Sequence, residues 1–212
     1  MIETKRLTVV EHPLVQHKLA YLRDIETPTV HFRKLVNEVT LLLTYEATKD
    51  METEEWEIET PLEKMTAQRI SGKKVAVCPV LRAGVGMLDG VLSLVSSARV
   101  GFIGMYRDEE TLQPVQYYSK LPTDLSDRDA IVLDPMLATG HSSAAAIDAV
   151  KEAGAHTVTL VCIVAAPPGI EFIHGKHPEV HIVCAAVDRA LDERGFIVPG
   201  LGDAGDRLYG TK

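Results

Sequence analysis

The sequence is poor in cysteine, carries no excess of positive charge and has no long apolar run. Cys78, Cys162 and Cys184 each lie in or beside an apolar, strand-like run. Buried free thiols explain such positions better than disulfides, metal ligation or nucleophilic catalysis. The net charge of −8 at pH 7 disfavours nonspecific nucleic-acid binding, because that binding needs a broad basic surface. A polyanionic ligand must therefore be bound at a local site.

No apolar stretch approaches the ~20 residues that a membrane span requires, and the N-terminal residues are polar and charged. We therefore expect a cytoplasmic protein that binds neither membranes nor nucleic acid. No Pro-, Gly- or Ser-rich linker and no shift in composition divides the chain. With 212 residues, 46% of them hydrophobic, the chain can bury one sizeable core, so we predict a single domain over residues 1–212.

The apolar pattern predicts an α/β fold. Thr27-Pro28 is typical of a helix start, and a broad apolar stripe from Val30 to Leu43 follows it. Trp56 to Thr60 reads as a short strand inside an acidic stretch, residues 50–63, whose simplest interpretation is a solvated edge. Apolar strand-like runs then alternate with helical segments: Lys74–Val80, Val100–Met105, Ala130–Leu133, Thr157–Ala165 and Val180–Val187. We predict a mostly parallel sheet flanked by helices, with N-terminal helices and a short β-arm.

One stretch predicts an anion site. Asp134-Pro-Met-Leu-Ala-Thr-Gly-His-Ser142 follows the run Ala130–Leu133 and leads into an alanine-rich helical pattern from Ala144 to Ala153. This order predicts a strand, a tight loop and the N-terminus of a helix. Such a junction presents unpaired backbone N–H groups and the positive end of a helix dipole, so it suits an anion, most often phosphate.

Individual side chains of this loop add to the prediction. Thr139, Ser142 and Ser143 supply hydroxyl donors, and Gly140 lets the backbone approach a ligand closely. Asp134 stands where the strand ends, and ligands of parallel α/β sheets bind at that edge. An acid there can accept hydrogen bonds from sugar hydroxyls, which a plain phosphate cradle does not offer.

Other patterns are weaker. Gly200-Leu-Gly-Asp-Ala-Gly205 fits G-x-G-x-x-G, but a dinucleotide site must open the helix of a βαβ unit, and too little chain follows. Gly169 to Lys176 misses the P-loop spacing and is interpreted as a surface turn and short helix. His174, His177 and His181 invite a metal site, yet a glycine and a proline between them interrupt the helix that would align them. We therefore expect exposed loop histidines.

The Asp134 loop resembles that of the phosphoribosyltransferases, in which an acid at the strand end takes the ribose hydroxyls and small, hydroxylic residues wrap the 5-phosphate. Most members carry two adjacent acids, whereas Pro135 follows Asp134 here. Taken together with Val80–Gly84 and Gly200–Gly205, this departure makes the chain similar to the uracil phosphoribosyltransferases in particular. Their resemblance spans nearly the whole chain and includes Val80-Leu-Arg-Ala-Gly84, Met105-Tyr-Arg-Asp108, Gly200–Gly205 and Gly210-Thr-Lys212. At the position of His141 the family usually has glycine.

The resemblance implies a reaction and its partners. Phosphoribose would pass from 5-phosphoribosyl 1-diphosphate (PRPP) to N1 of uracil, giving UMP and diphosphate in pyrimidine salvage. Mg²⁺ is expected to arrive chelated by PRPP, with no direct protein ligand. The resemblance also implies a homodimer or higher homo-oligomer, and GTP as an effector, which is known in some members.

The resemblance also implies which residues act. Arg107, Asp134 and Asp203 are the expected catalytic residues. Peptide groups of Ile197, Gly202 and Ala204 would read the uracil edge, with Asp203 on the phosphoribosyl side. The expected PRPP contacts are Arg82, Arg107, Asp134, Pro135, Met136, Leu137, Ala138, Thr139, Gly140, His141, Ser142 and Asp203.

Three alternatives stay open at this point. One is a phosphoribosyltransferase for another base, and a second is a pyrimidine regulator whose main task is binding RNA. The third is a catalytically silent nucleotide-sensing module. The acidic balance and the lack of a basic stripe count against the RNA regulator, and the set Arg82, Arg107, Asp134 and Asp203 counts against the silent module.

Overall fold

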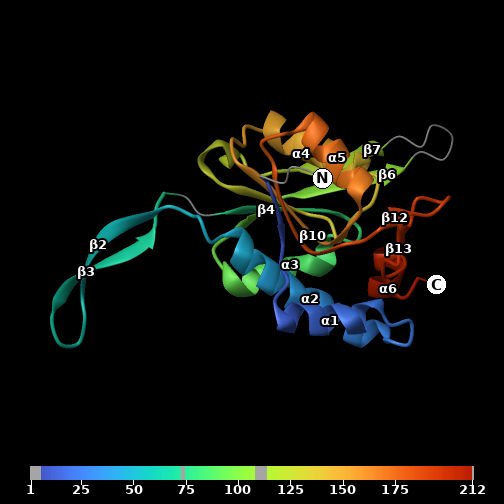
Figure 1. Ribbon diagram of the computed structural model, residues 1–212. Coiled ribbons are helices and arrows are strands. Elements are labelled where there is room, and N and C mark those ends of the chain that lie inside the picture. The colour runs from blue at the N-terminus through green and yellow to red at the C-terminus, as the bar shows by residue number, and fades with distance from the viewer. Residues whose placement is uncertain (1–5, 73–74, 108–113, 212) are drawn as a thin grey trace.

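The computed structural model describes residues 6–72, 75–107 and 114–211, apart from the side chains of Arg107 and Pro114. Its centre is a sheet whose neighbouring strands run parallel except for the last pair, so the predicted α/β fold is confirmed (Figure 1). In spatial order the main strands are β1 (Leu7–Val9), β11 (His181–Val187), β10 (Val158–Ala165), β8 (Ala130–Leu133), β4 (Ala76–Leu81), β6 (Phe102–Arg107) and β7 (Pro114–Lys120). The short strands β5 (Arg99–Val100) and β9 (Met136–Leu137) pair with β4 and β10.

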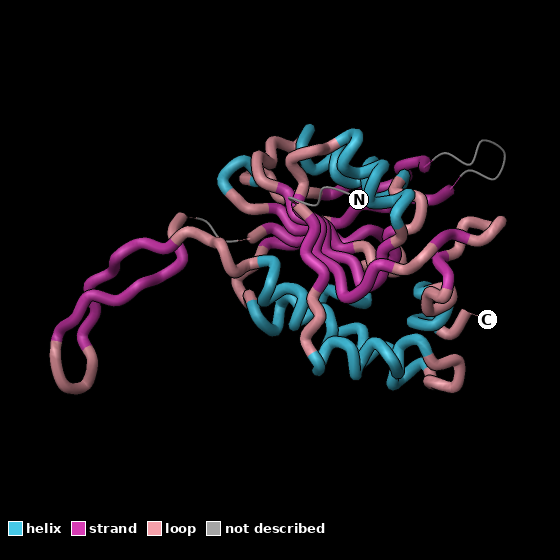
Figure 2. The backbone as a smooth tube through the Cα atoms, in the orientation of Figure 1, coloured by secondary structure: helices cyan, strands magenta, loops and turns pink. Residues whose placement is uncertain are grey.

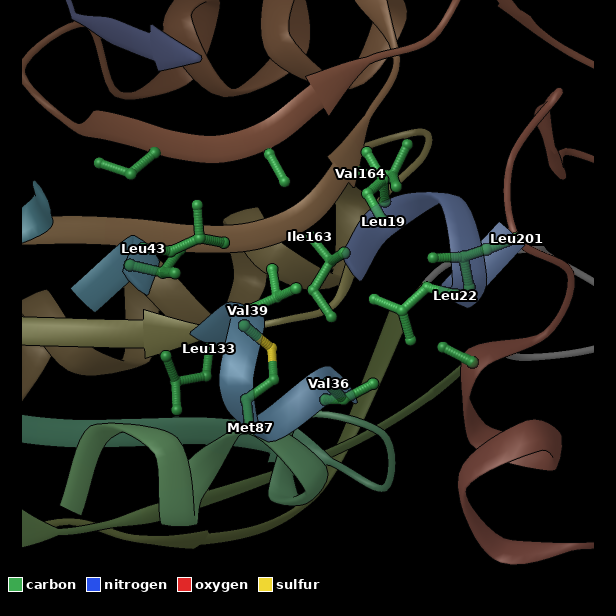
Figure 3. Packing of buried hydrophobic residues seen from close by; sticks show 14 of the residues in the cluster. Leu19, Leu22, Val36, Val39, Leu43, Met87, Leu133, Ile163, Val164 and Leu201 are labelled. Carbon is green, nitrogen blue, oxygen red and sulfur yellow. The ribbon is translucent and has the colours of Figure 1, made fainter. Parts of the chain in front are cut away.

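Alternate residues of the central strands enter two separate cores. Leu133 and Ile163 pack in the core shown in Figure 3, whereas Val132 and Cys162 belong to the core on the other face. Because both faces are buried, these strands are continuous apolar runs rather than alternating ones. One face is covered by α1 (Pro13–Arg23), α2 (Thr29–Ala47) and α3 (Val85–Leu94), and the other by α4 (His141–Glu152) and α5 (Pro167–Lys176) (Figure 1).

Local sequence signals explain where the helices begin. Pro28 is the N-cap of α2, so the helix predicted after Thr27-Pro28 is confirmed with its first residue at Thr29. Helix α4 begins at His141, ahead of the alanine-rich pattern. Gly140, its N-cap, has a φ of 84°, a left-handed conformation that glycine adopts without steric cost.

The acidic stretch forms the predicted β-arm. Strands β2 (Thr53–Glu59) and β3 (Lys64–Ile70) pair antiparallel, and the hairpin projects away from the body of the molecule (Figures 1 and 2). Trp56 is half exposed on this arm, and the guanidinium carbon of Arg69 lies 4.9 Å from its ring centroid. Elsewhere the chain forms a 3₁₀ turn (Leu125–Asp127), β12 (Ala190–Leu191), β13 (Ile197–Val198) and α6 (Ala204–Tyr209).

The expectation of exposed loop histidines is wrong. His174 lies within α5, which continues through Gly175, because one glycine weakens a helix without ending it. His177 is buried, with Nε2 3.1 Å from Asp148 Oδ1 on α4, and His181 lies in β11 with Nε2 2.8 Å from the Thr8 hydroxyl.

The prediction for the cysteines is confirmed, since Cys78, Cys162 and Cys184 are all buried and free. Burial raises the pKa of the Cys78 thiol to about 12, which makes it a poor nucleophile. Among the described helices, none combines the length and apolar character needed to cross a membrane.

Candidate active site

Two adjoining cavities open where β4 and β8 end. The first, here called the loop cavity, has a volume of about 220 Å³ and includes Arg82, Thr139 and Ser142 in its lining. The second, here called the C-terminal cavity, has a volume of about 250 Å³ and lies against residues 195–197 and 202–205. Four residues line both cavities and form their common wall: Ala83, Asp134, Met136 and Ala138. The carboxyl ends of parallel strands are where α/β proteins bind ligands.

Close backbone packing holds the loop from Asp134 to Ser142 in place. A Cβ atom added to Gly140 would meet the carbonyl oxygen of Gly169 at 2.9 Å, and one added to Gly169 would meet the oxygen of Ala138 at 2.5 Å. Both glycines are therefore required for α5 to pack against this loop. The result is a fixed loop that leads directly into the N-terminus of α4, as the sequence predicts for an anion site.

Asp134 is the most strongly perturbed group of the site. It follows β8, and its backbone N–H donates to the carbonyl of Val161 at 3.2 Å. Burial raises the pKa of its carboxyl group to about 6, while hydrogen bonds from the Ser143 hydroxyl and the Met136 N–H act in the opposite direction. The carboxyl group therefore changes its charge just below neutral pH.

The loop residues predicted to contact PRPP fall into two groups. Pro135, Met136, Ala138, Thr139, Gly140 and Ser142 line one or both cavities. Leu137 instead belongs to the core between the sheet and α4 and α5. His141 packs against Phe172, with ring centroids 4.3 Å apart, and is absent from both linings. The predicted hydroxyl donor Ser143 lines neither cavity, and its Oγ donates instead to Asp134 Oδ2 at 2.9 Å.

The two predicted arginines stand at the ends of neighbouring strands, β4 and β6. Arg82 follows β4 directly and extends an exposed guanidinium into the lining of the loop cavity. Its Nη2 lies 3.9 Å from Asp206 Oδ1, and the Tyr209 hydroxyl donates to its carbonyl oxygen at 2.9 Å. Arg107 is the last residue of β6, and its side chain lies outside the described part of the structure.

A charged pair that was not predicted from the sequence supports the chain segment beside the C-terminal cavity. The buried Asp188 accepts two hydrogen bonds from the Arg23 guanidinium, at 2.6 and 2.7 Å, and one from the Gly200 N–H at 2.8 Å. Arg23 also donates to the Gly200 carbonyl at 2.7 Å. An acid directly after an apolar strand was the available signal, since Asp188 follows β11 as Asp134 follows β8.

The residues predicted to bind the base lie together in this cavity. Ile197, Gly202, Asp203 and Ala204 all line it, so residues at the start of α6 face β13 across the space. Asp203 also caps α6, because its side chain accepts from the Asp206 N–H at 2.9 Å. Gly202 is exposed and has a φ of 80°.

Comparisons with known proteins assign the chain to a family. A fixed anion loop beside a second cavity at the strand ends is typical of α/β proteins that bind nucleotides or phosphorylated sugars. The chain belongs to the uracil phosphoribosyltransferase family, whose model matches residues 9–211. It is 55% identical over 207 residues to the uracil phosphoribosyltransferase of Staphylococcus aureus strain Newman, covering 98% of this chain and 99% of that one. The solved structure of the AQ2163 protein from Aquifex aeolicus is similar with a TM-score of 0.92 at 39% identity, covering 97% of this chain and 99% of that one.

Proposed function

We propose that this protein is a pentosyltransferase that transfers phosphoribose from PRPP to N1 of uracil, producing UMP and diphosphate in pyrimidine salvage. Membership in the uracil phosphoribosyltransferase family supports this reaction. The structural observation that carries the proposal is the common wall of the two cavities, with Asp134 in it. One substrate in each cavity would bring the ribose between them.

The proposed roles follow from this arrangement. The loop cavity takes the phosphates of PRPP on the backbone and hydroxyls of Thr139 and Ser142, with Arg82 at its edge. Asp134 accepts hydrogen bonds from the ribose hydroxyls. Attack of uracil N1 in line with the departing diphosphate inverts the anomeric carbon through an oxocarbenium-like state. The protein's main tasks are then to align both substrates and to neutralise the departing diphosphate. We assign this neutralisation to Arg107, and we place Asp203 beside the ribose.

Mg²⁺ is part of the proposal. Among the described residues, no group of three or more His, Cys, Asp or Glu side chains could hold a metal ion. We expect the ion to arrive with the diphosphate and ribose oxygens of PRPP and to keep several waters, as Mg²⁺ usually does. When bound, the ion would neutralise charge that develops on the diphosphate. Asp134 and Asp203 would contribute negative potential beside it, and neither is assigned as a direct ligand.

Backbone recognition of the base gives the proposal its sharpest test. If N–H and C=O groups near Ile197 to Ala204 pair with the 4-oxygen and N3–H of uracil, cytosine presents a donor to a donor and an acceptor to an acceptor. Such sites reject the wrong ligand by roughly 10⁴ or more in specificity. Hypoxanthine tests the remaining alternative of another base.

The experiment incubates purified protein with Mg²⁺, PRPP and uracil, cytosine or hypoxanthine, and quantifies each nucleotide formed. We expect UMP only, in the wild type and in Ile197→Ala, because peptide groups rather than the Ile197 side chain carry the preference. In Gly202→Val, a branched side chain at a φ of 80° is strained and enters the lining, so uracil use should fall. Comparable use of cytosine would place the base pocket elsewhere.

The oligomeric state of the protein and its regulation by GTP are also proposals. A homodimer or higher homo-oligomer gains support from the projecting arm of β2 and β3, because an isolated two-stranded hairpin is marginally stable in water. Trp56 and Met65 on the arm are exposed. Light scattering of the wild type and of Trp56→Ala measures the assembly, and adding GTP to the uracil assay tests GTP as an effector. A cytoplasmic location remains a prediction.

A further inference from the structure

We propose that Ser143 is a positioning residue that fixes the Asp134 carboxylate in the orientation required by the ribose hydroxyls. This inference deepens the proposed function and rests on it. Ser143 lies in the first turn of α4, its side chain is 2% exposed, and its Oγ donates to Asp134 Oδ2 at 2.9 Å. Its neighbour Ser142 lines the loop cavity, whereas Ser143 lines neither cavity. The two adjacent serines therefore have different tasks.

The surroundings of Asp134 leave Ser143 as the side chain that sets its rotation. The backbone of Asp134 is tied to β10 by its N–H bond to Val161, and the Met136 N–H donates to the carboxylate. A carboxylate has about four acceptor sites, so these two donors leave sites free toward the cavities for two ribose hydroxyls. Without the Ser143 hydroxyl, only one backbone donor holds a group that can turn about its side-chain bonds.

The position of α4 fixes the geometry of the hydrogen bond between Ser143 and Asp134. The helix starts at a fixed point, because Gly140 packs against Gly169 of α5. Ser143 is buried with Ala144, Ala146 and Ile147 in the core below the helix. Its hydroxyl therefore sits in a rigid setting, as a positioning group requires.

The charged and titratable groups around Asp134 come from each element packed on it. On β10, Cys162 lies opposite Cys184 of β11, and the hydrogen bond to Cys184, burial and Asp134 raise the pKa of the Cys162 thiol, so this thiol is a neutral neighbour. Arg82 approaches from β4 across the loop cavity and Asp203 from the start of α6 across the C-terminal cavity. On α4 the ring of His141 turns to Phe172. The Ser143 hydroxyl and the Met136 N–H thus favour ionised Asp134 against its burial.

The test compares Ser143→Ala and Ser143→Thr with Ser93→Ala, a matched control on α3 whose hydroxyl bonds to the Asp89 carbonyl. We expect Ser143→Ala to lower kcat/KM for PRPP roughly tenfold at pH 7, since it removes a hydrogen bond to a charged group. The acid midpoint of kcat/KM should rise by about one pH unit. KM for uracil should change little. The melting temperature at pH 7 should fall by only about 2 to 4 °C, because the higher pKa of folded Asp134 costs about 1 kcal/mol there. Ser143→Thr, which keeps the hydroxyl, should recover most of the loss.

A second readout does not depend on activity. Carbon-13 NMR of labelled aspartate should give a titration midpoint of about 6 for Asp134 in the wild type and Ser93→Ala, and a higher one in Ser143→Ala. An unchanged midpoint together with unchanged PRPP kinetics overturns the inference, as does an equal loss of rate at every pH with a larger fall in melting temperature. A wild type that forms no UMP refutes the proposed function instead, and the NMR midpoint then still reports on Ser143.

Discussion

The loop from Asp134 to Ser142 and the segment from Ile197 to Ala204 face each other across the site, but they differ in what holds them in place. Close backbone packing holds the loop, because Gly140 in the loop and Gly169 on α5 leave no room for a Cβ atom. The segment is also packed, since Ile197, Leu201 and Ala204 are buried in the core, and hydrogen bonds of Arg23 and the Gly200 N–H to the Asp188 carboxylate support it in addition. Both regions are therefore packed, and the segment depends on a charged pair as well. We infer that the phosphate side is rigid and that the base side depends on its charged support.

The largest effect should follow from removing the charge on the wall that the two regions share. Asp134→Asn keeps the shape of the side chain, so we expect an intact fold and a fall in kcat of roughly 10²- to 10³-fold, comparable to losing a preorganised electrostatic group. Steady-state kinetics with PRPP and uracil measure it. Normal turnover in the folded variant would remove Asp134 from the mechanism.

The same variant should be more stable in the absence of substrate. The pKa of Asp134 is raised from 3.8 to about 6 in the folded protein, so its stabilising contribution is present below about pH 4 and is lost as the pH rises through 6. The asparagine side chain that replaces it does not titrate. At pH 7.5 the free energy of unfolding of Asp134→Asn should exceed that of the wild type by about 1 to 3 kcal/mol, and the difference should vanish toward pH 4. Denaturant unfolding at both pH values checks the sign.

The next effect breaks the charged support of the base side. Asp188→Ala removes the carboxylate that pairs with the Arg23 guanidinium and leaves the Gly200 N–H without its acceptor, although Arg23 keeps its bond to the Gly200 carbonyl, so stability should fall by about 3 kcal/mol. KM for uracil should rise more than KM for PRPP, because Gly200 precedes the residues that line the C-terminal cavity. A variant in which both constants rise equally would show that the two regions are coupled. Arg23→Ala, from the other side of the pair, serves as the matched comparison.

Two glycine variants compare a closely packed position on the phosphate side with an open position on the base side. In Gly169→Ala the new Cβ would lie 2.5 Å from the Ala138 oxygen, so the loop must shift, and we expect a loss of about 1 to 3 kcal/mol and weaker PRPP binding. In Gly202→Ala the nearest atom is Arg207 Cδ at 3.6 Å, an ordinary contact, and only the left-handed backbone costs about 1 kcal/mol. Melting temperatures rank the two variants. The reverse order would contradict the proposed rigidity of the phosphate side.

The sequence was sufficient for the central strands of the sheet and for the main loop, for a physical reason, but it did not predict the edge strands β1 and β7. Strands buried on both faces are unbroken apolar runs, and β8 has the predicted bounds, Ala130–Leu133. Adjacent residues of a helix point about 100° apart, so which of Ser142 and Ser143 faces the ligand depends on how α4 is rotated. The burial of His177 likewise depends on the packing of α5 on α4. Such contacts join distant segments and leave no local pattern.

The smallest effect should come from His141, where the family usually has glycine. The residue begins α4 at the end of the rigid loop, yet its ring packs on Phe172 and is absent from both cavity linings. A contact between its ring and PRPP is therefore not expected. His141→Gly should therefore change KM for PRPP less than about twofold and cost about 1 kcal/mol through the lost ring contact and the added glycine. The test is KM for PRPP, measured for the wild type and His141→Gly between pH 6 and 8. A KM that rises strongly in the variant, and rises more at low pH, would mean that the protonated ring of His141 binds the phosphate.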